Sequence, residues 1–133
     1  MRVLSPAMRA FLEEKRFAVL ATLNADGSSQ QTVMWYLIED DELLFNTKRG
    51  RKKQRNLERD PRVSLCIGDG YRFVTVSGTA RELSDPATAQ ADIRRLAARY
   101  SGEPSAEQQM QRFSREERIS YRVRIGRILS MGF

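Results

Sequence analysis

The side chains best suited to chemistry are six basic residues within a stretch of eight. They are Lys48, Arg49, Arg51, Lys52, Lys53 and Arg55. The chain carries 23 Lys and Arg against 17 Asp and Glu, for a formal net charge of +6. Without these six residues the remaining charges would balance. The whole positive excess lies in one short segment, which predicts a binding site for an anion.

The position of this segment supports the same interpretation. It follows the apolar stretch 42–47, contains Gly50 and begins a short predicted helix. A cation at a helix start costs a few tenths to about 1 kcal/mol, because the macrodipole is positive there. Free backbone N–H groups at a helix start also favour phosphate. A bound anion would offset the repulsion, with Arg51 making a two-pronged contact and Lys53 supplying a point charge.

Two other interpretations of the basic segment remain open. Runs of charge are usually solvated helix faces, and short Lys/Arg-rich stretches also bind nucleic acid. A nucleic-acid surface needs a broader basic face with interleaved aromatic residues. Arg122, Arg124 and Arg127 could extend the patch, but Glu116 and Glu117 dilute it. We therefore expect a small anionic ligand and no nucleic acid.

The composition places limits on the class of protein. The 133 residues predict a single domain, 1–133. No run approaches the ~20 apolar residues of a membrane helix, and the first residues lack the apolar core of a signal peptide. We expect a cytoplasmic protein that binds no membrane. The single cysteine, Cys66, excludes an intrachain disulfide, and its apolar surroundings in 63–67 predict a buried, inert thiol.

The chain contains no histidine. Its absence excludes the usual Ser-His-Asp and Cys-His catalytic sites and any histidine metal site, so we predict no metal. An enzyme of this composition must use Lys, Tyr or carboxylates, or a cofactor that carries the chemistry itself. We identify no dedicated catalytic side chain.

The hydrophobic pattern predicts a mainly β fold with six strands. They span residues 17–23, 30–38, 43–47, 63–67, 72–83 and 119–125. The first is continuously apolar, which predicts a strand buried on both sides, and Gly78 predicts a bulge in the fifth. Trp35 and Tyr36 are adjacent on the second strand, so one should face the core and the other a site or interface.

Helices are predicted around these strands. Ser5-Pro6 and Asp85-Pro86 are typical helix starts, and Gly102 should end the second of these helices. The polar stretch 103–113 should hold at most a loose helical turn. The pattern lacks a βαβ rhythm, which argues against a parallel sheet. We expect a six-stranded antiparallel split β-barrel with peripheral helices, because closure removes exposed strand edges.

Residues 51–65 (RKKQRNLERDPRVSL) resemble the split-barrel flavin and deazaflavin reductases related to pyridoxamine 5'-phosphate oxidase. Further blocks agree in order and spacing at 18–22, 26–27, 32–36, 43–47 and 76–80. The resemblance covers about residues 5–130. It implies a homodimer with two cofactors at the subunit interface.

The resemblance also implies a set of cofactor-binding residues. It assigns the cofactor phosphate to Arg51 and Lys53, with Lys52 and Asn56 beside them. It also places a strand segment along the tricyclic ring of the cofactor. This segment consists of Thr32, Val33, Met34 and Trp35. Thr47 would face the ribityl chain or the phosphate. Tyr71 would close over the site, from the same subunit or from the partner subunit.

The sequence of residues 46–51 (NTKRGR) resembles that of the family branch that uses the deazaflavin coenzyme F420. In this branch Lys48 and Arg49 would suit the acidic tail of the coenzyme. We expect an F420-dependent oxidoreductase that transfers hydride between reduced deazaflavin and a small conjugated acceptor. The alternatives are an FMN-dependent reductase and a non-enzymatic flavin- or deazaflavin-binding protein. Pyridoxamine phosphate oxidation and haem handling are disfavoured, because both rely on histidine.

Overall fold

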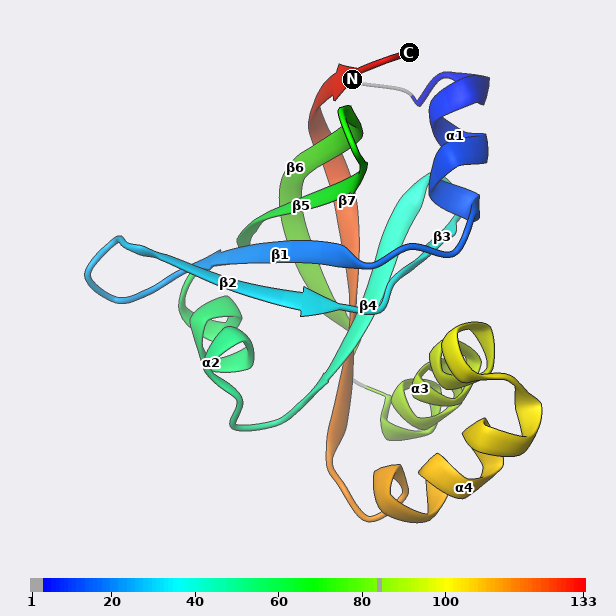
Figure 1. Ribbon diagram of the computed structural model, residues 1–133. Coiled ribbons are helices and arrows are strands. Elements are labelled where there is room, and N and C mark those ends of the chain that lie inside the picture. Colours follow the sequence, from blue (N-terminus) through cyan, green and yellow to red (C-terminus); the bar gives the residue numbers. More distant parts are fainter. Residues whose placement is uncertain (1–3, 84) are drawn as a thin grey trace.

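The computed structural model describes residues 4–83 and 85–133 and contains one antiparallel sheet with helices packed against it (Figure 1). The strands are β1 (Ala18–Leu23), β2 (Ser29–Met34), β3 (Leu37–Glu39), β4 (Glu42–Lys48), β5 (Arg62–Asp69), β6 (Arg72–Leu83) and β7 (Arg118–Met131). The helices are α1 (Pro6–Glu13), α2 (Lys52–Arg59), α3 (Pro86–Ser101) and α4 (Glu103–Phe113). None of the helices in this described part is long and apolar enough to cross a membrane.

The sheet has seven strands in the order β2-β1-β5-β6-β7-β4-β3, so the prediction of six strands was wrong. The predicted strand 30–38 is divided. Its first half, β2, pairs with β1, and its second half, β3, pairs with β4. The two outermost strands of the sheet are therefore consecutive in the chain. This arrangement is consistent with a split barrel, in which a bent segment joins the two edges.

The division occurs at Trp35 and Tyr36, and Tyr36 explains it. This side chain is 0% exposed, and its hydroxyl donates to the Leu12 carbonyl at 2.8 Å. The Tyr36 backbone bonds the Tyr100 hydroxyl through both its N–H and its carbonyl, at 3.3 and 3.2 Å. A backbone held by a side chain of α3 cannot continue a strand ladder, so β2 ends before it.

The core has two parts. One lies inside the curved sheet and includes Leu20, Phe45 and Leu65. The other lies between the sheet and the α3–α4 hairpin, where Leu44 meets residues of both helices. Consecutive residues of β4 thus enter different cores, and β4 is the strand that is buried on both sides. The prediction of that property for 17–23 was wrong, because β1 buries only alternate residues.

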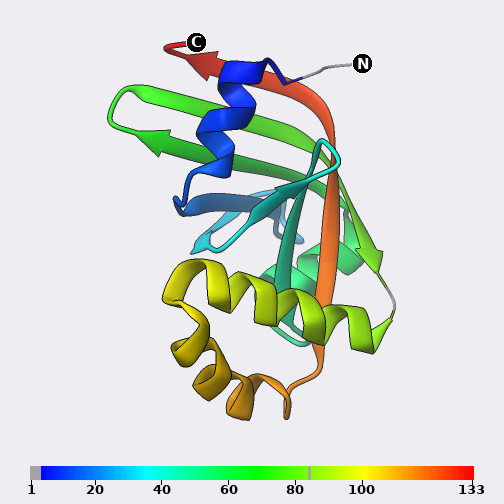
Figure 2. The same cartoon turned by 90° about the vertical axis from the view of Figure 1, so that its right-hand side faces the viewer.

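Residues 103–113 form a complete helix, α4, and not the loose turn predicted from their polarity. Gly102 adopts a positive φ of 84° and links α3 to α4. Three apolar side chains of α4 then pack against α3, which provides the stabilisation that the composition concealed: Ala106, Met110 and Phe113. Figure 2 shows α3 lying across β4 and β7, with α4 beyond it.

The predicted bulge at Gly78 is confirmed, since the β6–β7 register shifts between Ser77 and Gly78. A Cβ atom at this glycine would lie 1.8 Å from the Arg124 carbonyl oxygen. The close backbone approach therefore requires glycine. The extra, unpaired residue of the bulge is Gly126 of β7, opposite the step from Ser77 to Gly78.

One face of the sheet is left uncovered. A single cross-strand row runs over five strands, and its members in order are Val33, Val19, Cys66, Thr75 and Leu129. Val33 is 66% and Leu129 63% exposed. Cys66 is exposed as well, so the prediction of a buried thiol was wrong for the protomer. We call this row the open face.

Candidate functional site

The start of α2 is the centre of the basic segment. Arg51 occupies the N-cap position, and no side chain caps the helix. The first backbone N–H groups of a helix have no partner within it. Gly50, with a φ of 93°, reverses the chain here, and its N–H donates to Gln54 Oε1 at 2.8 Å. The turn is thus fixed by the helix that it begins.

Two of the six cations are paired with carboxylates. Arg49 Nε lies 2.6 Å from Glu117, and Arg49 Nη1 lies 3.0 Å from Glu58. Lys48 Nζ lies 3.8 Å from Glu116. These pairs argue against the predicted role of Lys48 and Arg49 at an acidic coenzyme tail, because much of their charge is already compensated.

The other four cations form no ion pair with the described residues, and they lie on two sides of α2. Arg51 and Lys53 line a pocket between β2, β4 and α3. Lys52 and Arg55 line a second hollow, between α2 and the β1–β2 hairpin. The basic segment therefore serves two separate surfaces.

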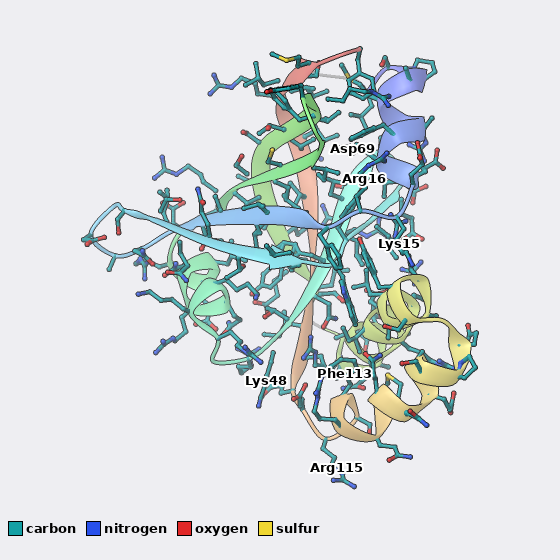
Figure 3. All side chains as sticks on the ribbon, in the orientation of Figure 1. Lys15, Arg16, Lys48, Asp69, Phe113 and Arg115 are labelled. Atoms are coloured by element: carbon teal, nitrogen blue, oxygen red, sulfur yellow. The ribbon has the colours of Figure 1, made fainter. Side chains whose placement is uncertain are left out.

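We call the first of these the site pocket, and its volume is about 230 Å³. It is lined by Val33, Met34, Trp35, Asn46, Thr47, Lys48, Arg51, Lys53, Ile93, Leu96, Phe113 and Arg118. One side is cationic, the other is apolar, and none of these residues is acidic. In Figure 3, Lys48 and Phe113 lie in the region between α2 and the α3–α4 hairpin. No group of His, Cys, Asp and Glu in the described ranges could hold a metal ion.

The environment of the pocket changes the pKa of Lys53. The side chain is half-buried, and this desolvation lowers its pKa below that of a free lysine. The positive charges of Arg51 and Arg118 lower the pKa further. The charged form of Lys53 is therefore poorly compensated within the protein, and a bound anion would supply the missing charge.

Arg118 is the site residue that the sequence analysis missed. Its side chain is only 9% exposed. Nε donates to Asn46 Oδ1 at 2.9 Å and Nη1 to Glu116 Oε1 at 2.8 Å. The guanidinium lies over the Phe113 ring, 4.9 Å from its centroid. The sequence signal that could have identified it is its position one residue before the predicted strand 119–125. In the β4–β7 pairing this position places Arg118 opposite Lys48.

Trp35 forms one wall of the pocket, and this resolves the question about the adjacent aromatic pair. Tyr36 belongs to the core, while Trp35 stacks on Tyr100 with ring centroids 5.4 Å apart and planes at 8°. Phe17 stacks on the same Tyr100 ring at 5.4 Å. The single hydrogen of the Tyr100 hydroxyl is shared between the Arg16 and Tyr36 carbonyls. Tyr100 thus holds Trp35 in place.

Six of the ten predicted site residues line the pocket: Val33, Met34, Trp35, Thr47, Arg51 and Lys53. Thr32, Lys52, Asn56 and Tyr71 do not. Asn56 Nδ2 instead donates to Thr22 at 3.1 Å and to Asn24 at 3.0 Å, tying α2 to β1. Tyr71 is 91% exposed in the β5–β6 turn. It could reach a site only in another protomer.

Residues 4–128 match the pyridoxamine 5'-phosphate oxidase family. The chain is 39% identical over 82 residues to a pyridoxine/pyridoxamine 5'-phosphate oxidase of Rubrobacter xylanophilus, a match that covers 59% of this chain and 38% of that protein. The matched part thus spans under two fifths of the relative's length.

Two solved structures are similar over nearly the whole chain. The conserved hypothetical protein Rv2991 of Mycobacterium tuberculosis has a TM-score of 0.79 and 31% identity, with 96% of this chain and 84% of that chain covered. A structure described as an F420 reductase has a TM-score of 0.77 and 26% identity, with 95% and 98% covered. The chain belongs to the pyridoxamine 5'-phosphate oxidase family.

Proposed function

We propose that this protein is an oxidoreductase that binds coenzyme F420 in the site pocket and transfers hydride between the reduced deazaflavin and a small conjugated acceptor. The observation that carries the proposal is a pocket lined by four cations and no carboxylate, with an apolar wall opposite. The similarity to an F420 reductase over 98% of that chain supports the choice of cofactor.

The residues present fit a planar ring that carries a phosphate. Arg51 and Lys53 provide charged donors for the phosphate, and Arg is well suited to a two-pronged contact. Trp35 and Phe113 provide apolar surface for a ring. The carboxylate-free lining avoids repulsion of the anion. These features match the phosphorylated flavin cofactors as a class.

The size of the pocket supports a homodimer. Pockets for ligands of this size are usually about 300–1,000 Å³, and one chain provides about 230 Å³. Val33 belongs both to the pocket and to the open face. A second copy packed on the open face would cover its exposed apolar side chains and complete the pocket. In this arrangement Tyr71 of the partner subunit would cover the ring.

When bound, the cofactor supplies or accepts the hydride. The protein binds the phosphate through Arg51 and Lys53 and orients the ring against the wall that includes Trp35. A ring packed against the apolar wall would exclude water there, which would strengthen the electrostatic interactions within the site. The cations can then stabilise negative charge that develops on the acceptor during transfer.

FMN is the second candidate, because the phosphate-binding cations do not distinguish the two rings. The deazaflavin coenzyme differs by its acidic tail. The hollow on the other side of α2, about 500 Å³ in volume, offers three cations for such a tail, Lys52, Arg55 and Arg59, beside one carboxylate, Asp26. The ion pairs of Lys48 and Arg49 leave this hollow as the better place for it.

Pyridoxamine 5'-phosphate is not proposed as the substrate. The curated relative carries that name, but this chain has no histidine, and the resemblance implies that pyridoxamine phosphate oxidation relies on one. A protein that carries the cofactor without catalysis is the remaining alternative. It would bind the ring and show no turnover with any acceptor.

Titration with F420 and with FMN tests the proposal, and the fluorescence of Trp35, the single tryptophan, reports binding at the pocket wall. We expect saturable quenching, tighter for F420, and oxidation of the reduced coenzyme by conjugated acceptors. Tighter binding of FMN would favour the second candidate. Binding of neither would refute the proposal. If nucleic acid were the ligand, its affinity would fall steeply with salt.

A further inference from the structure

Arg118 is held by a buried chain of hydrogen bonds that starts on α3. Asn46 donates through Nδ2 to the Ala89 carbonyl at 2.9 Å and to Ser120 Oγ at 3.0 Å. The Ser120 hydroxyl donates to Asp92 Oδ2 at 2.7 Å. Asn46, Ser120 and Asp92 are all buried. The chain therefore connects the interior of α3 to the site pocket.

The direction of these bonds determines which atom meets Arg118. A carboxylate only accepts hydrogen bonds, so Asp92 makes the Ser120 hydroxyl a donor. The Ser120 oxygen is then available to accept from Asn46. With both hydrogens of its amide used, Asn46 presents Oδ1 to Arg118 Nε, at 2.9 Å. The guanidinium is thus oriented before any ligand arrives.

The charge around Arg118 is only partly compensated. Glu116 is its single ion-pair partner among the described residues, and the other carboxylate oxygen of Glu116 lies 3.8 Å from Lys48. Glu116 is thus shared by two of the four pocket cations, Lys48 and Arg118, while Arg51 and Lys53 have no ion-pair partner among the described residues. Arg118 Nη2 forms no hydrogen bond with the described residues, so this nitrogen is available to a ligand.

We propose that Arg118 is a third phosphate-binding residue of the pocket, contributed by β7 and positioned by the Asp92–Ser120–Asn46 chain, and that the three cations Arg51, Lys53 and Arg118 together hold one phosphate group. The inference rests on the proposed function, because it assigns the anion to the phosphate of a ring cofactor. Burial of Arg118 against Phe113 makes its charge more effective than that of an exposed arginine.

The test compares ligands that differ only in the phosphate. Wild-type protein and variants are titrated with riboflavin and FMN, and with 8-hydroxy-5-deazariboflavin and its 5'-phosphate. The readout is the phosphate preference, the ratio of the two dissociation constants for one ring. Arg118→Met should reduce this preference about 10- to 100-fold, the scale of a charged hydrogen bond. Binding of the unphosphorylated ring should change little.

Arg124→Met is the matched control, since Arg124 is an exposed arginine on the same strand without a hydrogen bond or ion pair to the described residues. It should keep the wild-type preference. Ser120→Ala should reduce the preference severalfold, and should have no further effect when combined with Arg118→Met. A purely structural role of Ser120 would instead weaken all four ligands in both backgrounds.

The outcomes separate the two claims. If Arg118→Met keeps the wild-type preference, or weakens both forms of a ring equally, the inference about Arg118 is wrong while the proposed function stands. If the wild-type protein binds none of the four ligands, the proposed function fails. If Arg118→Met does not fold, Arg118→Lys is used, because lysine keeps the charge but cannot reproduce the guanidinium geometry. It should lower the preference at least threefold, and an unchanged value would again contradict the inference.

Discussion

Replacing Lys53 by methionine should stabilise the ligand-free protein against unfolding and lower its affinity for the cofactor. The half-buried ammonium has a lowered pKa, first from desolvation and then from Arg51 and Arg118. The folded state therefore disfavours its charged form relative to the unfolded chain, in which lysine has its ordinary pKa. Methionine keeps the length of the side chain and removes the uncompensated charge.

The binding effect of Lys53→Met follows from one charged hydrogen bond to phosphate. Such a bond contributes about 1.5–3 kcal/mol, so the dissociation constant should rise roughly 10- to 150-fold. The unfolding midpoint of the ligand-free variant should equal or exceed that of wild type. Fluorescence titration measures the first quantity and urea unfolding the second. Lys15→Met, at an exposed position after α1, is the control and should change neither.

The pH dependence has a defined sign. Lys53 loses its proton below the pH at which a free lysine would, because its pKa is lowered, whereas an arginine guanidinium is not deprotonated in proteins. Phosphate affinity of the wild type should therefore fall as the pH rises through the lowered pKa of Lys53. Lys53→Met should show no such decline. Unchanged affinity in Lys53→Met at neutral pH would refute the assignment of Lys53 to the site.

Three further predictions concern the sheet. Leu129→Asp places a charge on the open face away from the pocket, so light scattering should show a monomer for the variant and a dimer for the wild type. A monomeric wild type would contradict the shared-site proposal. Gly78→Ala should destabilise the fold by at least about 2 kcal/mol in urea unfolding, because its Cβ must displace the Arg124 carbonyl, whereas Gly126→Ala, with a Cβ contact of 3.3 Å, should cost less. Cys66 should react with a thiol reagent more slowly as protein concentration rises, and a rate independent of concentration would place the thiol outside the interface.

The strands and turns were largely predictable, because alternation and glycine-containing turns are local signals. The division of strand 30–38 was not. It depends on the Tyr100 hydroxyl, which lies 64 residues away in the chain from Tyr36. A local pattern cannot reveal a partner that arrives from another helix. The same limitation explains α4, whose stability comes from packing on α3.

The errors about residues 17–23 and Cys66 share a physical cause. An apolar run indicates that a strand will be covered, but it does not indicate what covers it. β1 and β5 bury one side within the protomer, and their other side carries the open face. From the sequence alone, a second subunit and a second layer of the same chain give the same pattern.

Pocket residues that belong to the cluster of basic residues could be predicted from the sequence, whereas an isolated basic residue of the pocket could not. The cluster around α2 identified Arg51 and Lys53 directly. Arg118 is one arginine among many, and its place in the pocket depends on the β4–β7 register and on Asn46. The division of the cations between paired and free also required the positions of Glu116 and Glu117 in space.

The strand order has a consequence for how the molecule assembles. β7 lies between β6 and β4, although it follows both of them in the chain. Until residues 118–131 are in place, the sheet exists as two unconnected pieces, β2-β1-β5-β6 and β4-β3. The last strand, β7, therefore joins the two pieces into one sheet. A nascent chain still lacking it leaves the facing edges of β6 and β4 unpaired, and the site pocket lacks Arg118 until this strand is in place.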